Sequence, residues 1–289
     1  MAIIKKYKHM KKYNKTKAYN KKDSSKKERD KQGLNLSSYK EKKIQKDKPV
    51  KNNKIIRLNK FIAHAGICSR READNIIMNG DITVNGKVIT EMGTKILEND
   101  VVKYKEKILK AERFVYVLLN KPKGFISTVY DPHERKTVMN LVKNACEERI
   151  FPVGRLDRNT TGVLLFTNDG DLVKKLTHPK YKVEKIYYAE LDKELVNEDM
   201  IKISKGLELE DGFIKPDDIS YISGEEKNKI GIKIHSGKNH IVRRIFEDLN
   251  YKVVRLDRVN FAGFTKKNLK RGDWRLLLQK EINLLKMTL

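Results

Sequence analysis

A carboxylate lies between two guanidinium groups in the middle of the chain, in the run Arg155-Leu156-Asp157-Arg158. Residues 159–162 read Asn-Thr-Thr-Gly and predict a loop, whereas residues 163–166, Val-Leu-Leu-Phe, predict a short buried strand. An aspartate on a loop packed against a rigid strand is well placed to act as a nucleophile or as a general base. The alternative interpretation is that Asp157 only forms salt bridges with its neighbours.

The same four residues recur as Arg255-Leu256-Asp257-Arg258. Apolar and polar residues alternate around this copy, which predicts a half-buried strand without a loop. We therefore expect the Asp257 side chain to point at solvent and to take no part in the chemistry.

Two further carboxylates follow the predicted buried strand, in Asn168-Asp169-Gly170-Asp171. Asp169 or Asp171 is predicted to cap a short helix, because an apolar periodic segment comes next. A metal-dependent nuclease is the other use of this pair, and it would need further convergent carboxylates. Neither His nor Cys residues have the spacing of a metal site, so we expect no metal.

The chain of 289 residues carries a formal net charge of +26, which predicts a polyanionic partner, nucleic acid rather than a membrane surface. No apolar run approaches the roughly 18–20 residues that span a bilayer, and the first residues lack a secretory signal. Two cysteines without a Cys-x-x-Cys motif agree with a reducing compartment, so we expect a cytoplasmic protein. Residues 1–54 contain 20 Lys and Arg against 5 Asp and Glu and predict a disordered basic tail, either an RNA-binding arm or a solvated linker.

Residues 55–104 predict a small helix–helix–hairpin unit. Ser69 and Glu72 form a capping box for the second helix, and Asn85-Gly86 predicts a type I′ hairpin turn. Arg70 and Arg71 lie in the first turn of that helix, where cations oppose the helix dipole by about 0.3–1 kcal/mol each. Such a position favours phosphate binding, since the free amides of the first turn attract the same ligand.

Lys103 to Glu112 predicts a charged linker, and residues 112–289 predict a second domain. Its strands are expected at 114–121, 163–166, 181–191, 230–234 and 253–261, and its helices at 138–146, 172–176 and 240–249.

The run 152–170 resembles the signature of the pseudouridine synthases that modify ribosomal RNA and carry an S4 domain in front. Asn120-Lys121-Pro122-x-Gly124 resembles the opening element of that family, and Lys185-x-Tyr187 resembles its Lys-x-Tyr motif. Residues 236–245 resemble its last motif, from which the chain departs at Ser236, His240 and Ile241. Residues 57–61 and 69–73 resemble the S4 pattern.

The resemblance implies a role for each matching residue. Asp157 would be the catalytic carboxylate, Tyr187 would lie beside the target base, and Arg243 would approach Asp157. Arg155 would position an RNA phosphate or the flipped nucleotide. The S4 match implies RNA contacts from Arg57, Lys60, Arg70 and Arg71. The reaction that the resemblance implies, isomerisation of uridine to pseudouridine, requires neither a cofactor nor a metal.

The expected fold class is α+β, with a small N-terminal S4 RNA-binding domain followed by a catalytic domain that has a mixed, largely antiparallel sheet. The implied function is site-specific isomerisation of uridine to pseudouridine in ribosomal RNA, with the large subunit favoured. The expected partner is ribosomal RNA or a pre-ribosomal particle, bound by a monomer. The remaining alternative is a non-catalytic RNA-binding factor for ribosome assembly.

Overall fold

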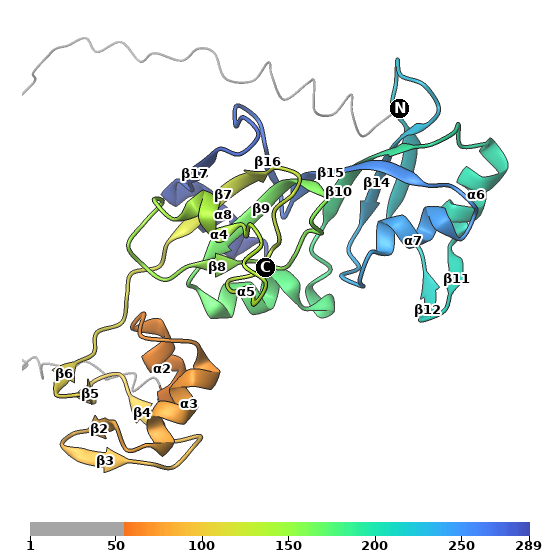
Figure 1. The fold of residues 1–289 in the computed structure, drawn as a ribbon. Coiled ribbons are helices and arrows are strands. Elements are labelled where there is room, and N and C mark those ends of the chain that lie inside the picture. The colour runs from red at the N-terminus through yellow and green to blue at the C-terminus, as the bar shows by residue number, and fades with distance from the viewer. Residues whose placement is uncertain (1–54) are drawn as a thin grey trace, which may run out of the picture.

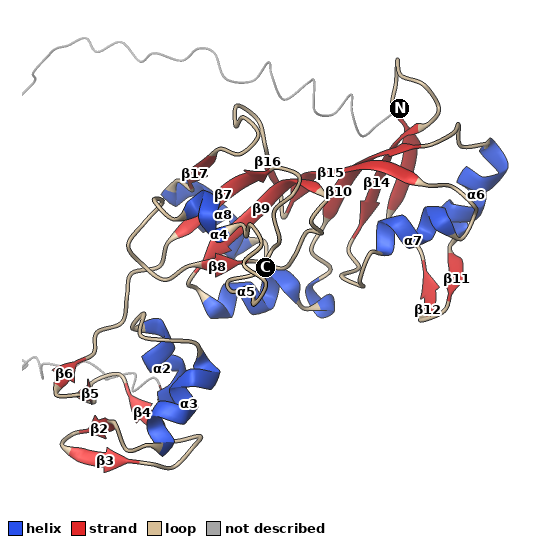
Figure 2. Ribbon diagram, in the orientation of Figure 1, coloured by secondary structure: helices blue, strands red, loops and turns tan. Residues whose placement is uncertain are grey.

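The computed structural model describes residues 55–289 (Figures 1 and 2). The predicted basic tail, residues 1–54, lies outside the described residues. Within residues 55–289, no helix has the length and apolar character needed to cross a membrane.

The N-terminal unit consists of two helices packed on short strands, as the helix–helix–hairpin prediction requires. Its elements are β1 Ile55–Arg57, α2 Leu58–His64, α3 Arg70–Met78, β2 Ile82–Val84, β3 Lys87–Ile89, β4 Lys95–Leu97, β5 Val102–Tyr104 and β6 Lys107–Ile108. The strands form an antiparallel sheet in the order β3-β2-β5-β6, and β1 pairs with β4.

Local signals in the sequence account for much of this unit. The capping box is present, because Ser69 accepts from the Glu72 amide while the Glu72 carboxylate accepts from the Ser69 amide. Asn85 and Gly86 both have positive φ, 50° and 82°, as a type I′ turn requires. The prediction of a linker at 103–112 is wrong for its first half, since β5 and β6 are strands of this sheet and Leu109 belongs to its apolar core.

The second domain is built on a nine-stranded sheet in the order β13-β14-β10-β15-β9-β7-β17, with β16 paired to β15 and β8 paired to β9. The strands are β7 Tyr116–Lys121, β8 Phe151–Pro152, β9 Thr161–Thr167, β10 Lys185–Leu191, β13 Asp218–Tyr221, β14 Lys229–Ile234, β15 Val253–Phe261, β16 Phe264–Thr265 and β17 Trp274–Leu276. Only the β9–β15 pair is parallel, so the expected mixed, largely antiparallel sheet is confirmed.

Helices and a hairpin surround this sheet (Figure 2). They are α4 Met139–Val142, α5 Gly170–Thr177, the 3-10 turn Pro179–Tyr181, α6 Asn197–Lys205, the hairpin β11 Leu207–Leu209 with β12 Gly212–Ile214, α7 Ile241–Glu247 and α8 Gln279–Met287. Helix α7 packs its apolar side on β10, β14 and β15 in one core, whereas β7 and β9 pack with α4, α5 and α8 in two others.

The two halves of the sheet meet at the parallel junction of β9 and β15. The ladder there has only two residue pairs, Thr161 with Asp257 and Gly162 with Arg258. Gly162 has φ +108°, and a Cβ on it would lie 2.2 Å from the Arg258 carbonyl oxygen. The close approach of the two backbones therefore requires glycine at this position.

The prediction that Asp257 points at solvent is wrong. Its side chain is 5% exposed and accepts from Thr161 Oγ1 at 2.5 Å and from Arg271 Nη1 at 3.1 Å, and it also pairs with Lys266. Burial does not alternate along this strand, since Leu256, Asp257 and Arg258 are all buried, and residues 265–272 supply the cations that meet Asp257 on the side the pattern assigned to water.

Candidate active site

The catalytic candidate Asp157 lies on the loop between β8 and β9, which a buried lysine holds from beneath. Lys121, at the end of β7, is fully buried. Its Nζ donates to the backbone oxygens of Asp157 at 3.0 Å and Thr160 at 2.8 Å, and it reaches those of Pro122 and Arg158 at 3.2 and 3.4 Å. One ammonium group therefore fixes the backbone of the loop from Asp157 to Thr160.

The Asp157 carboxylate has two side-chain partners and remains 30% exposed. Thr160 Oγ1 donates to Oδ2 at 3.2 Å, and His240 Nε2 lies 3.2 Å from Oδ1. His240 immediately precedes α7 and has a left-handed backbone, φ +49°. A side chain other than glycine in this conformation is uncommon and is often found at functional positions.

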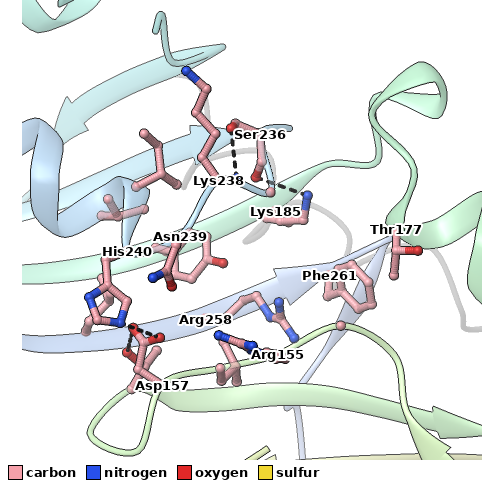
Figure 3. Close-up of a pocket in the computed structure, with 18 of the residues that line it drawn as sticks. Arg155, Asp157, Thr177, Lys185, Ser236, Lys238, Asn239, His240, Arg258 and Phe261 are labelled. Carbon is pink, nitrogen blue, oxygen red and sulfur yellow. Dashed lines mark hydrogen bonds and ion pairs between the residues drawn. The ribbon is translucent and has the colours of Figure 1, made fainter. Parts of the chain in front are cut away.

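Asp157 borders a cavity of about 360 Å³. Figure 3 shows Asp157 and His240 joined at one end of this cavity, with Arg155 and Arg258 near its middle and Phe261 and Thr177 at the other end. Asp157 is the only carboxylate among the lining residues, which are otherwise cationic, polar and apolar side chains. The cationic and aromatic members are Arg155, Lys185, Tyr187, Lys238, His240, Arg258 and Phe261.

Positive charge is concentrated below and beside the carboxylate. Burial lowers the pKa of Lys121 to about 8, a shift that the negative charge of Asp157 opposes and the positive charge of Arg258 reinforces. Burial also lowers the pKa of Lys185 to about 8, and Arg258 again adds to the shift. Lys185 Nζ donates to the backbone oxygens of His235 at 2.8 Å and Ser236 at 3.2 Å. The cavity floor is therefore a basic environment that favours an electron-rich ligand.

A second hollow of about 1080 Å³ adjoins the first and shares Arg155, Leu156, Asp157 and His240 with it. Its other basic residues are Lys123, Arg158, Arg243 and Lys252. A surface of this kind suits the phosphate backbone of a nucleic acid.

The structure brings together three of the four catalytic and substrate-binding residues expected from the sequence. Asp157, Arg155 and Tyr187 border the same cavity. Arg243 lies in the adjoining hollow, where Nη1 donates to the Val253 carbonyl oxygen at 2.7 Å. The imidazole of His240, rather than the Arg243 guanidinium, lies 3.2 Å from the Asp157 carboxylate.

The four residues expected to contact RNA lie in the N-terminal unit. Arg70 and Arg71 are exposed in the first turn of α3, and Arg57 is exposed at the end of β1. Lys60 in α2 forms an ion pair of 2.7 Å with Asp171 in α5 of the second domain.

Reasoning from the sequence assigned no role to Lys121, Lys185, His240 or Arg258. Two of these had a usable signal. Lys121 ends a strand whose first four residues are apolar. Lys185 is two residues from Tyr187, so the strand period places the side chains of Lys185 and Tyr187 on one face. His240 and Arg258 reach the cavity only through the packing of α7 and β15, which no local pattern predicts.

The carboxylates weighed for a nuclease have structural roles. Asp169 caps α5 by accepting from the Leu172 amide at 3.1 Å, and it also accepts from the Tyr116 hydroxyl at 2.8 Å. Asp171 pairs with Lys60 at the surface. Across residues 55–289, no group of three or more His, Cys, Asp or Glu side chains is arranged to hold a metal ion.

Comparisons with known proteins agree with this arrangement. The family model described as RNA pseudouridylate synthase matches residues 115–248, and that of the S4 domain matches residues 56–102. The chain is 40% identical over 225 residues to an uncharacterized RNA pseudouridine synthase of Aquifex aeolicus, covering 77% of this chain and 90% of that protein. It is also 40% identical over 228 residues to the ribosomal large subunit pseudouridine synthase B of Bacillus subtilis, covering 78% and 93%.

A solved structure, described as a pseudouridylate synthase, has the same fold. It superposes with a TM-score of 0.57 at 28% identity, covering 80% of this chain and 99% of that one. The chain therefore belongs to the RNA pseudouridine synthase family and carries an S4 domain in front of the catalytic domain.

Proposed function

We propose that this enzyme isomerises specific uridines of ribosomal RNA to pseudouridine and that Asp157 is its catalytic carboxylate. The observation that carries the proposal is the position of Asp157, the only carboxylate among the described residues that line a cavity with several basic and aromatic side chains. Asp157 lies on a loop whose backbone is fixed by Lys121, and its carboxylate contacts the side chains of Thr160 and His240.

The reaction breaks the bond between N1 of the uracil and C1′ of the ribose and joins C5 of the same base to C1′. A carboxylate can support it as a nucleophile at C1′ or as a base at the sugar. Either role uses the carboxylate as an electron-pair donor. Since the base must leave the helical stack, the enzyme needs a site that receives it outside the duplex.

Three other residues complete the substrate site in this proposal. Tyr187 borders the cavity beside Lys185 and Arg258, where its ring stacks on the flipped base, a contact worth about 1–3 kcal/mol. Arg155 is exposed at the rim shared by the two hollows and binds the phosphate of the flipped nucleotide. Arg243 binds the backbone of the flanking RNA in the larger hollow.

The S4 domain supplies a separate binding site for the RNA backbone. Arg57, Lys60, Arg70 and Arg71 provide the cations, and the free amides at the start of α3 favour phosphate near Arg70 and Arg71. The pair between Lys60 and Asp171 is largely exposed, so it is worth at most about 1 kcal/mol and exchanges readily for a phosphate contact.

Ribosomal RNA of the large subunit is the proposed substrate. The support is the relative from Bacillus subtilis, which is named for the large subunit and matches over 93% of its length. A second relative with that name, from Vibrio cholerae, is 36% identical over 233 residues.

The test uses the full chain and ribosomal RNA transcripts that contain 5-tritiated uridine. Wild-type protein should release tritium from large-subunit RNA and not from small-subunit RNA, and mapping of the product should show discrete sites. Asp157→Asn should abolish release while keeping RNA affinity within about tenfold, or about 1.4 kcal/mol. RNA binding without any release by wild-type protein would favour the alternative, a non-catalytic assembly factor.

A further inference from the structure

Arg258 is a buried cation in the floor of the active-site cavity. It lies on β15, opposite Tyr187 of β10 on one side and Gly162 of β9 on the other, and its side chain is almost completely buried. Nε donates to the Val163 carbonyl oxygen at 2.8 Å, and the guanidinium lies 4.5 Å from the centre of the Phe261 ring. Figure 3 shows the guanidinium between Arg155 and Phe261, inside the ring of lining side chains.

In the part of the chain that the structure describes, no carboxylate pairs with this cation. Among residues 55–289, Arg258 forms no ion pair, and its buried Nη2 has no hydrogen-bond partner. Its field instead lowers the pKa values of two neighbouring ammonium groups, those of Lys121 and Lys185, beyond the larger effect of their burial. Burying an unpaired charge is unfavourable, so this arrangement lowers stability unless a ligand supplies the opposite charge.

The reaction generates such a charge within the cavity. When the bond between C1′ and N1 breaks, its electron pair leaves with the base, and the Asp157 carboxylate forms a bond to C1′. The uracil then carries one negative charge, shared among N1, O2 and O4. When C5 bonds to C1′, the carboxylate leaves with the electron pair of its own bond, C5 loses its proton to water and N1 takes a proton from water.

Building on the proposed function, we propose that Arg258 is a second catalytic residue, which donates a hydrogen bond to a carbonyl oxygen of the flipped uracil and stabilises the base while it carries negative charge. A preorganised donor of this kind acts more strongly on the transition state than on the neutral base. The phosphate is the less suitable partner, because Arg155 and Lys238 already provide cations at the rim. A contact to O4 would also favour uracil over cytosine, whose amino group at C4 offers a donor where uracil offers an acceptor, whereas a contact to O2 would accept both bases.

The variants Arg258→Gln and Arg258→Lys test this role. We expect Arg258→Gln to lower kcat by about 100–1,000-fold with KM within about threefold, since removal of one such donor has this effect in other enzymes. Arg258→Lys keeps the charge without the planar fork and should lose less. Arg255→Gln is the matched control, because Arg255 is exposed on the same strand, does not line the cavity, and should retain wild-type kcat.

Combining the Arg258 variants with sulfur-substituted substrates distinguishes a catalytic role of Arg258 from a role in stabilising the sheet. Transcripts carrying 4-thiouridine or 2-thiouridine replace one carbonyl oxygen by sulfur, a weaker acceptor, and turnover is read as modified nucleoside by mass spectrometry. If Arg258 binds that oxygen, one of the two thio substitutions should slow wild-type protein and have a smaller effect on Arg258→Lys. Folded Arg258 variants with wild-type kcat, a loss confined to KM, or additive losses with both thio substrates would overturn the proposal. Inactive wild-type protein would instead overturn the proposed function.

Discussion

The two Arg-Leu-Asp-Arg copies separate catalysis from stability, because only one of their carboxylates is buried. The Asp257 side chain is 5% exposed and holds Thr161, Lys266 and Arg271, whereas the Asp157 side chain is 30% exposed. Asp257→Asn keeps the size of the side chain and removes the charge that these two cations share. Hydrogen bonds to charged groups are worth about 1.5–3 kcal/mol, and breaking a buried pair costs about 3–5 kcal/mol.

Partial exposure of Lys266 and Arg271, 27% and 33%, reduces that value, so we expect Asp257→Asn to lower the free energy of unfolding by about 2–4 kcal/mol. For a domain of this size the change corresponds to a fall in Tm of about 4–16 °C. The loss should persist in about 0.5 M salt, because salt screens buried pairs weakly.

Thermal and urea unfolding of both variants near neutral pH measure the effect. Asp157→Asn is the matched control and should stay within about 0.5 kcal/mol of wild type, because its carboxylate is partly solvated. A change below about 0.5 kcal/mol for Asp257→Asn, or equal losses for the two variants, would refute the view that burial distinguishes the two copies.

Two further predictions follow from the junction of the sheet and from its buried lysines. Gly162→Ala should destabilise the protein by about 1–3 kcal/mol more than Gly124→Ala. Both glycines have positive φ, but only at Gly162 would the added Cβ meet backbone, 2.2 Å from the Arg258 carbonyl oxygen. Equal Tm values for the two variants would contradict this prediction. Lys121, Lys185 and Lys266 have folded-state pKa values near 8, below those of the unfolded chain, so the unfolded state binds more protons above pH 8. The free energy of unfolding, measured by urea titration, should therefore rise between about pH 8 and 10, and it should rise less steeply in Lys185→Met. A steady fall over this range would contradict the assignment.

Local patterns predicted the elements whose cause is local. The capping box at Ser69 and the Asn85-Gly86 turn depend on a few adjacent residues, and the loop-and-strand context of Asp157 is read from neighbours as well.

What failed were expectations that depend on contacts between distant segments. The sequence pattern of β15 does not predict whether water or the cations of residues 265–272 contact Asp257. The resemblance implied that Arg243 approaches Asp157, and the structure places a further side chain there, because the left-handed backbone of His240 brings its imidazole within 3.2 Å of the carboxylate. Arg258 was set aside with its neighbour, although alternate residues of one strand face opposite environments.

The short parallel ladder between β9 and β15 joins the two sides of the sheet that supply the catalytic machinery. Asp157 and the lysine beneath its loop belong to the half that contains β7 and β9, whereas Tyr187, Lys185 and His240 belong to the half that contains β10 and α7. Side chains also cross this junction, because Asp257 accepts from Thr161, Arg258 donates to the Val163 carbonyl oxygen, and Phe261 of β15 packs in one core with β7 and β9. The protein itself therefore holds the carboxylate at a set distance from the base-binding wall, and an RNA that contacts both halves meets a preformed spacing.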